Sequence, residues 1–457
     1  MKSGWILGAL LASGLAAQEL PTHPVQVPAQ HRGQAPVEDN LARSKWFELF
    51  QDPHLQVLVN RALEQNLDLK QAVARVESAR ANLGIKGSDQ WPRLNLTAAL
   101  NQSMVSANSP TFVAGFLPRN RPFGEVLINL LNFEIDLFGR VHHQTQAAAA
   151  QLWASEEDRK AVMTALVAEV ASSYFNLLEF DAELQLARAT LGSHQATLAL
   201  VEARERGGVA SMLEVYQARQ LVEQTGLAIA ESERQVSLLE NRLQQLSGGL
   251  PGPVERGSLL VQVVLPEVPA GLPSELLSRR PDIRSAELTL AAQEELSEVA
   301  RRAIFPRISL TAFLGVQSSS LSNLFSSPSG TFFINPVISQ PLFDAGLGSA
   351  EQLAESQQQL ALLRYQQVVQ QAFREVADGL SDHARFREIA AGQQQLVDTL
   401  EQRSRLAQAR YLGGVDSQLN WLDAERDLFA ARVGLAQARR NQLLSVVQLY
   451  KALGGGW

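Results

Sequence analysis

The chain has 457 residues, no cysteine and a formal net charge of −7 at pH 7. The acidic balance argues against a nucleic-acid partner, because binding a phosphate backbone requires clustered lysine and arginine side chains. The absence of cysteine excludes disulfide bonds, thiolate metal sites and cysteine nucleophiles, and we expect no lipid anchor on an N-terminal cysteine.

The first residues have the pattern of a secretory signal peptide. Lys2 precedes an uncharged run over residues 3–18, which carries the small residues Ala16 and Ala17 near its end. The run is shorter than the ~20 residues that a membrane-spanning helix needs, so we predict a cleaved signal over 1–17 rather than an anchor helix. No later segment is predicted to form a transmembrane helix, so any membrane crossing is expected to use strands.

The chain contains two copies of one unit. Residues 92–100 (PRLNLTAAL) resemble residues 306–314 (PRISLTAFL) at an offset of 306 − 92 = 214, and residues 203–218 resemble 409–424 at an offset of 413 − 207 = 206. Because the two similarities keep their order, a whole unit was duplicated. The predicted parts are an extended N-terminal leader over 18–51, a first repeat over 52–247, an equatorial linker over 248–280, a second repeat over 281–449 and a C-terminal tail over 450–457.

Each repeat is predicted to contain a helix, a β-hairpin, a long helix and a returning helix. The opening helices are expected from Pro53 to about Gly84, with Asp52 as the N-cap, and from 281 to about 303. Alternating apolar and polar residues predict β-hairpins over 92–138 and 306–343. Such alternation suits strands with a wet lumen on one side and lipid on the other, although an ordinary sandwich hairpin remains an alternative.

The acidic residues of the first hairpin have two interpretations. Glu134 and Asp136 alternate with Phe133, Ile135 and Leu137, which is typical of a polar lumen opposite an apolar exterior. Alternatively, acids at a strand–helix junction bond to nearby amides.

The helical parts are expected to be unusually long. No proline lies in 123–250 or 342–457, so neither stretch contains a helix breaker. A helix over 142–206 would be on the order of 100 Å long, and double-glycine turns would return the chain through helices of about 37 residues each. The predicted coiled-coil seam of the first long helix is Met163, Val170, Leu177, Leu184, Leu191 and Leu198, with Leu166, Phe180 and Val201 beside it. The corresponding stripe of the second long helix is weaker and consists of Val369, Val376, His383, Ala390 and Val397.

Four strands per chain cannot close a membrane barrel. Barrels need at least about eight strands, because an open sheet edge leaves backbone groups without partners in hydrocarbon. The chain is therefore expected to oligomerise. Two copies would give eight strands and a plugged lumen, and three would give twelve strands with room for a passage.

Six separated motifs, in order, resemble the TolC/OprM-like outer-membrane factors, including the NodT-type channels of RND efflux systems. The motifs are Trp46–Phe50 with Asp52-Pro53, Asp136–Arg140, Arg279–Arg284, Phe305–Leu310, Pro341–Asp344 and Ala452–Gly456. The resemblance implies a mainly α TolC-like α/β-barrel: a homotrimer with a twelve-stranded transmembrane β-barrel in the outer membrane and a twelve-helix tunnel through the periplasm. It also implies docking to a periplasmic adaptor (membrane fusion protein) and an inner-membrane RND pump.

The resemblance further places functional residues at the double-glycine turns, which are expected to form the inner mouth. The implied periplasmic gate residues are Arg410, Leu412 and Asp416. The implied adaptor-contacting tips are Gly207, Gly208, Val209, Gly413, Gly414 and Val415. Threefold symmetry would bring three Asp416 carboxylates together in a ring that favours cations or water. The alternative for Asp416 is a helix-capping acid.

Three neighbouring side chains have a second candidate role. Tyr411, Arg403 and Arg405 lie close to the second turn and could latch adjacent hairpins through charge-assisted hydrogen bonds. Solvated helix faces are the alternative for the arginines.

The sequence contains no catalytic signature. His142 and His143 are adjacent, so on a helix their side chains point apart, unlike the i, i+4 pairs that share a metal. There is no phosphate-binding glycine loop, nucleophile elbow or zinc signature, so no enzyme activity, cofactor or metal is expected. The predicted function is a passive exit duct of a tripartite efflux system for drugs, metals or other small solutes. The alternatives are a type I protein-secretion duct and a secreted coiled-coil scaffold.

Overall fold

The computed structural model describes residues 47, 50–104, 106, 120–259, 262 and 273–455. The predicted signal peptide, most of the predicted leader, much of the linker and the last two residues lie outside the described residues. The chain divides into two compact units. Of the described residues, one unit comprises Val76–Ala154 and Ala286–Tyr365, and the other comprises the remainder.

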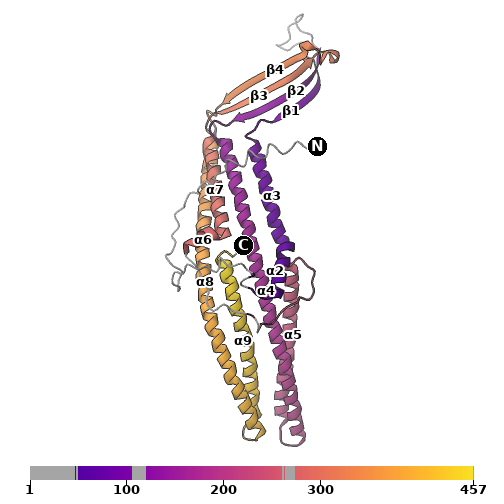
Figure 1. The fold of residues 1–457 in the computed structure, drawn as a ribbon, viewed down its shortest axis with the longest axis vertical. Coiled ribbons are helices and arrows are strands. Elements are labelled where there is room, and N and C mark those ends of the chain that lie inside the picture. The colour runs from indigo at the N-terminus through magenta and orange to yellow at the C-terminus, as the bar shows by residue number, and fades with distance from the viewer. Residues whose placement is uncertain are drawn as a thin grey trace. The chain divides into compact units, whose positions relative to one another are not determined.

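The first unit contains a four-stranded antiparallel sheet (Figure 1). Its strands are β1 (Leu94–Met104), β2 (Asn120–Ile135), β3 (Arg307–Ser318) and β4 (Gly330–Ser339). The order is β1-β2-β3-β4, so β2 of the first repeat pairs with β3 of the second, for example at Ile135 and Ile308. Strands β1 and β4 are the two edges, and each pairs with one strand among the described residues. The second hairpin also contains the short 3-10 helices η3 (Leu321–Asn323) and η4 (Ser327–Ser329).

The two faces of the sheet differ in polarity, as the alternation predicts. On β1, Leu96, Leu100 and Met104 are each 73% exposed. The other face of β1 is polar: Asn129 Nδ2 donates to Thr97 Oγ1 at 2.9 Å, and Asn101 donates to Glu125 at 3.2 Å. Strand β1 therefore has an uncovered apolar face and a hydrogen-bonded polar face. Across β3 and β4 the second face also carries the stacked rings of Phe313 and Phe333.

The acids at the end of the first hairpin bond to the start of the next helix, α4 (Arg140–Arg206). Glu134 accepts two hydrogen bonds from Arg140, at 3.0 and 2.8 Å, and Asp136 accepts one from the His142 backbone N–H at 2.7 Å. Asp136 thereby satisfies a free amide at the helix N-terminus. The junction interpretation is therefore confirmed for Asp136, whereas Glu134 bonds to a guanidinium and not to an amide.

The predicted helix from Pro53 to Gly84 is two helices, α2 (Pro53–Gln65) and α3 (Leu67–Ser88). The predicted cap is correct, because Asp52 Oδ1 accepts from the His54 backbone N–H at 2.9 Å. The break falls at Asn66, whose Oδ1 accepts from the Leu69 N–H while its Nδ2 donates to the Leu246 carbonyl, both at 3.0 Å. The prediction of a single helix was wrong, because the Asn66 side chain caps α3 and also bonds to the last residue of α5.

The long helices are present. Helix α4 has 67 residues, and α8 (Ala345–Leu412) has 68. Each is followed by a helix of 35 residues, α5 (Met212–Leu246) and α9 (Gln418–Ala452). Two further helices, α6 (Pro273–Arg279) and α7 (Pro281–Arg302), precede β3.

Helix α4 is more apolar than we expected from the sequence. It is the one helix among the described residues with an 18-residue window that satisfies the length and composition of a membrane span, with a mean hydropathy of 1.4. We expected no segment after the signal peptide to be long and apolar enough for a transmembrane helix, and by length and composition this was wrong. Because 56% of the window is buried within the chain, a helix that packs in a protein core gives the same signal.

The coiled-coil seam of α4 was predicted only in part. Val170 and Leu177 are buried, but Leu184, Leu191 and Leu198 are only half-buried. Leu166 and Val201 of the predicted adjoining stripe are buried as well. The buried positions towards the end of α4 are Ala187, Thr190, His194, Thr197 and Val201, of which only Val201 was predicted. This seam keeps a 3–4 spacing but is largely polar, so a search for leucines cannot find it. The weaker stripe of α8 is buried at Val369, Val376, His383 and Val397.

Several motif residues meet in the core of the second unit. The Phe50 ring packs edge-on against Phe175 and Tyr450, with centroids 6.0 and 6.3 Å apart. Arg280 is 6% exposed and donates to both Asp282 oxygens, at 3.0 and 2.6 Å, and to the Ala452 carbonyl at 2.9 Å. Arg280 also lies 2.9 Å from Glu375 on α8. One guanidinium thus joins the start of α7 to the end of α9 and to α8.

Replacing Arg280 with alanine is expected to destabilise this core. The change leaves two carboxylates and the Ala452 carbonyl without their donor, which typically costs about 3 kcal/mol. We expect a clearly lower unfolding temperature for Arg280→Ala, measured by thermal scanning of the purified protein. Arg385→Ala is the control, because Arg385 forms an exposed i, i+3 pair with Glu388 on α8 and should leave the temperature unchanged.

Candidate functional site

The two double-glycine turns have the same geometry. Gly208 and Gly414 have φ angles of +73° and +71°, which glycine adopts without the clash that a Cβ causes. In each turn the next residue donates to the carbonyl five positions back: Val209 N to Arg204 O at 2.9 Å, and Val415 N to Arg410 O at 3.0 Å. This is the Schellman arrangement, and it ends α4 and α8 sharply so that α5 and α9 can return.

The caps of the returning helices differ between the repeats. Ser211 and Glu214 form a capping box, in which the Glu214 N–H donates to Ser211 Oγ and the Ser211 N–H donates to the Glu214 carboxylate. The equivalent Ser417 makes no side-chain cap. Asp416 instead accepts from the Ser417 N–H at 2.9 Å and from Asn420 Nδ2 at 2.6 Å.

Two of the three predicted gate residues are joined within one chain. Arg410 Nε donates to Asp416 Oδ2 at 3.2 Å, while the Leu412 side chain is 53% exposed and joins neither. The hydrogen bonds from Asn420, the Ser417 N–H and Arg410 lower the pKa of Asp416, so its carboxylate is ionised at neutral pH. Asp416 precedes the N-cap residue Ser417 and accepts no hydrogen bond from a backbone amide of α9, so the capping interpretation was wrong. Its carboxylate places a negative charge at the tip of the α8–α9 hairpin.

Tyr411 connects the second helical hairpin (α8–α9) to the first (α4–α5). It is buried, stacks on Trp421 with centroids 5.5 Å apart, and lies under the Arg204 guanidinium of α4 at 4.9 Å. Sequence reasoning missed Arg204 and Trp421. A signal for Arg204 existed, because it aligns with Arg410 at the repeat offset of 206.

The two neighbouring arginines bond inside their own hairpin. Arg403 pairs with Asp427 at 2.7 Å, and Arg405 donates to the Glu401 carbonyl at 3.3 Å. Both side chains are exposed, so the solvated-face interpretation holds for them within the chain.

The predicted tip residues expose apolar side chains. Val209 and Val415 are each 67% exposed. Other exposed apolar residues flank the turns: Met212, Leu213, Leu412 and Leu419. Several exposed apolar side chains close together in the sequence at the end of each helical hairpin are compatible with a protein-binding surface.

Nearer the middle of α4, away from the turn, a buried polar cluster joins this helix to α9. Arg440 donates to Asn176 at 3.0 Å and lies 3.2 Å from Glu179, whose exposure is only 2%. The approach to Glu179 is not aligned for a hydrogen bond, so one carboxylate oxygen stays without a donor. Burial raises the pKa of Glu179 from its ordinary value of 4.5 to about 7, despite the nearby Arg440. Burial also raises the pKa of Glu183, which accepts from Gln437 at 3.1 Å.

The histidine pair lies at the start of α4. His143 Nδ1 is 2.5 Å from Glu295, and the two histidine rings are 5.8 Å apart. Within the described part of the chain, no three His, Cys, Asp or Glu side chains are grouped to hold a metal ion.

Comparison with known proteins matches residues 58–249 and 272–455 to the family model described as "Outer membrane efflux protein". The chain belongs to this family. The two matched segments correspond to the two repeats, and the family consists of outer-membrane transport channels rather than enzymes. The protein is therefore a TolC-like efflux channel of the Gram-negative outer membrane, which extends into the periplasm. The secreted-scaffold alternative was wrong.

Individual relatives cover nearly the whole chain. The solvent efflux pump outer membrane protein SrpC of Pseudomonas putida is 41% identical over 90% of this chain and 87% of its own. The cation efflux system protein CusC of Escherichia coli is 35% identical over 99% and 96%. The crystal structure of the open state of the Neisseria gonorrhoeae MtrE outer membrane channel superposes with a TM-score of 0.85 at 29% identity, covering 96% of this chain and 98% of that one.

The buried Glu179 predicts a pH dependence of stability. The folded state holds its proton up to about pH 7, whereas the unfolded chain releases it near 4.5. The stabilising contribution is therefore complete below pH 4.5 and is lost as the pH rises to about 7, with a size on the order of 3 kcal/mol.

We expect the unfolding temperature of the wild type to fall more steeply between about pH 5 and about pH 8 than that of Glu179→Gln. Glu169→Gln removes an exposed partner of Arg242 and should keep the wild-type slope. Equal slopes for wild type and Glu179→Gln would contradict the assignment.

Proposed function

We propose that three copies of this chain form a closed duct through the outer membrane and periplasm. Support comes from the two edges of the sheet, β1 and β4, which have no second strand among the described residues. Hydrocarbon offers no hydrogen-bond partner, so each β4 edge requires the β1 edge of a neighbouring copy. Three copies supply twelve strands and a lumen with room for a passage, whereas two supply eight strands and a filled one.

The helical hairpins would form the periplasmic part of the duct. Each chain contributes α4–α5 and α8–α9, so a trimer has twelve helices around one tunnel. The exposed apolar tips, which include Val209 and Val415, would bind the helical hairpin of a periplasmic adaptor. An inner-membrane RND pump would supply the energy, and the duct itself would be a passive path without catalytic activity.

The names of the relatives favour efflux of small solutes over protein secretion. SrpC is named for solvent efflux and CusC for cation efflux, so drugs, solvents and metal ions are the proposed classes of cargo. A type I secretion duct has the same architecture. Crosslinking of the adaptor to Val209 or Val415 positions, followed by identification of the pump bound to that adaptor, distinguishes the two.

We further propose that Asp416 and Arg410 control the periplasmic opening. In the trimer, three Asp416 carboxylates would approach the threefold axis, each held in place by Arg410, Asn420 and the Ser417 N–H. Fixed carboxylates near the axis would favour cations and resist closer approach. Leu412, which is exposed and one turn before Asp416 along the chain, would narrow the same opening.

The trimer is tested by the mass of the native oligomer. We expect native mass spectrometry of detergent-solubilised protein to show three chains and no stable monomer. A dimer, or a folded water-soluble monomer, would refute the closed duct.

The gate is tested by conductance in planar bilayers. Asp416→Ala removes both the charge and the acceptor for the Ser417 N–H, so we expect a higher conductance and weaker cation preference. Asp416→Asn keeps an acceptor for the Ser417 N–H, which separates the two effects: a gate based on charge predicts the same change in both variants. Asp423→Ala removes an exposed acid of α9 that pairs with Arg426, and it should change neither quantity.

A further inference from the structure

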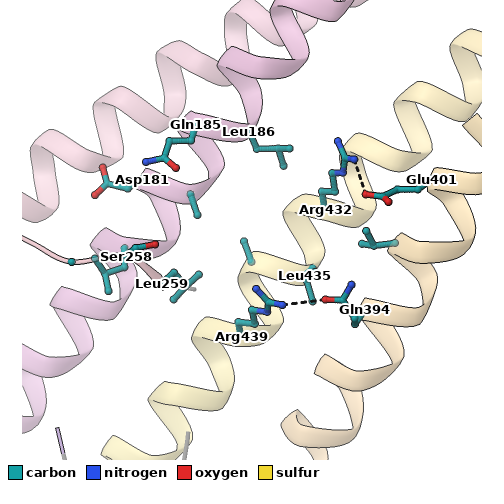
Figure 2. Close-up of a pocket in the computed structure, with 15 residues that line it drawn as sticks. Asp181, Gln185, Leu186, Ser258, Leu259, Gln394, Glu401, Arg432, Leu435 and Arg439 are labelled. Atoms are coloured by element: carbon teal, nitrogen blue, oxygen red, sulfur yellow. Dashed lines mark hydrogen bonds and ion pairs between the residues drawn. The ribbon is translucent and has the colours of Figure 1, made fainter. Parts of the chain in front are cut away.

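A cavity of about 520 Å³ lies between the two helical hairpins of the second unit. Its walls come from α4, from residues 257–259, and from α8 and α9 (Figure 2). Cavities of about 300–1,000 Å³ are typical of small-molecule sites in proteins. Neither the turns nor the polar cluster around Arg440 contributes a lining residue.

Much of the lining is apolar and comes from every wall. The apolar lining residues are Leu178, Ala182, Leu186, Leu259, Val397, Leu435 and Ala436. Leu178 and Leu259 are almost fully buried, at 1% and 4% exposure. An apolar molecule in the cavity would therefore contact α4 on one side and α9 on the other.

Two arginines of α9 form the cationic part of the lining. Arg432 and Arg439 are seven residues apart and extend towards α8, with Leu435 between them (Figure 2). Arg432 donates to Glu401 at 2.7 Å, so its charge has a carboxylate partner. On the α4 side, Asp181 is already bonded to both Arg256 Nε and Nη2.

Arg439 lacks such a partner. Its guanidinium donates to the neutral amide oxygen of Gln394 at 3.1 Å, and among the described residues no carboxylate pairs with it. The Gln394 amide in turn donates to Asp398 at 2.9 Å. The Asp398 carboxylate is therefore linked to Arg439 only through Gln394 and does not bond to it directly. A half-buried guanidinium with only an amide acceptor retains unused donors and an uncompensated charge.

The arginines are also a departure from the repeat. At the offset of 206, Arg432 corresponds to Gly226 and Arg439 to Glu233, which binds Arg188 of α4. The first hairpin thus forms the same pair of long helices without either arginine. A role in pairing α8 with α9 does not require them.

We propose that the cavity binds an amphipathic organic anion. The carboxylate, or an anion of similar size, would accept hydrogen bonds from Arg439, and the apolar body would lie against Leu178, Leu259 and Leu435. Anions of this kind match both features at once, since the free donors and the apolar surface are in one cavity. A bound molecule would contact both hairpins and stabilise their present arrangement by mass action.

The test uses 2-naphthoate as the probe and the full-length oligomer in lipid nanodiscs, with empty nanodiscs as the blank for partitioning. Isothermal titration should show saturable binding of 2-naphthoate to the wild type. 2-Naphthalenemethanol carries the same rings without the charge, and acetate carries the charge without the rings. We expect each to bind at least about tenfold more weakly, since a charged hydrogen bond and the buried apolar area each contribute that much.

Two variants place the binding in this cavity. Arg439→Gln should raise the dissociation constant of 2-naphthoate at least about tenfold, and Ala182→Leu should also raise it, because the larger side chain occupies part of the space. Arg374→Gln is the matched control, because Arg374 makes the same type of bond to a glutamine, Gln371, on the exposed face of α8. Naphthoate should raise the unfolding temperature of the wild type and of Arg374→Gln but not that of Arg439→Gln.

The proposal is overturned if 2-naphthoate does not bind the wild type. It is equally overturned if Arg439→Gln and Ala182→Leu bind as tightly as Arg374→Gln, because the probe would then occupy another surface. Acetate that binds as well as naphthoate would show an unspecific anion contact and would also refute it.

Discussion

The pairing of backbone groups in the sheet is the constraint on which the rest of this protein depends. In the part of the chain that the structure describes, a four-stranded sheet with β1 and β4 as edges leaves two rows of amide and carbonyl groups without strand partners. In water such edges are tolerated, but in hydrocarbon each unpaired group costs several kcal/mol. The exposed leucines of β1 show that one face of this sheet suits lipid. An outer-membrane channel built from this chain therefore requires further copies of it.

The duplication provides a common framework on which the two repeats differ. Both turns use a glycine at positive φ and the same backbone hydrogen bonds, so the return of the chain is fixed by backbone geometry. Side chains then diverge at equivalent positions. The first helical hairpin caps α5 with Ser211 and Glu214, whereas α9 has no side-chain cap and Asp416 lies at the turn, bonded to Arg410 and Asn420. The proposed gate and the proposed anion site both depend on such differences, including Arg439 in place of Glu233.

The polar side chains buried between the helices lower the stability of the fold relative to apolar ones. Thr190, His194 and Thr197 occupy the seam of α4 where leucines would pack more favourably, and His194 bonds to Thr225 at 2.9 Å. Glu179 stays buried with one oxygen lacking a donor. Helix pairs with such seams are less stable than apolar ones but more specific in register.

The sequence by itself determined the duplication, the β-hairpins, the long helices, the glycine turns and the family, because these depend on local periodicity and on backbone conformations that only certain residues adopt. It also identified Asp52 as a cap, since capping is a local interaction. The tertiary structure alone decided what depends on side chains distant in the chain. Asn66 breaks a helix because it also bonds to Leu246, 180 positions away, and Arg280 reaches Ala452 across 172 positions. The partners of Tyr411 and Arg439 are of the same kind, since periodicity shows which face a residue occupies but not which side chain lies opposite.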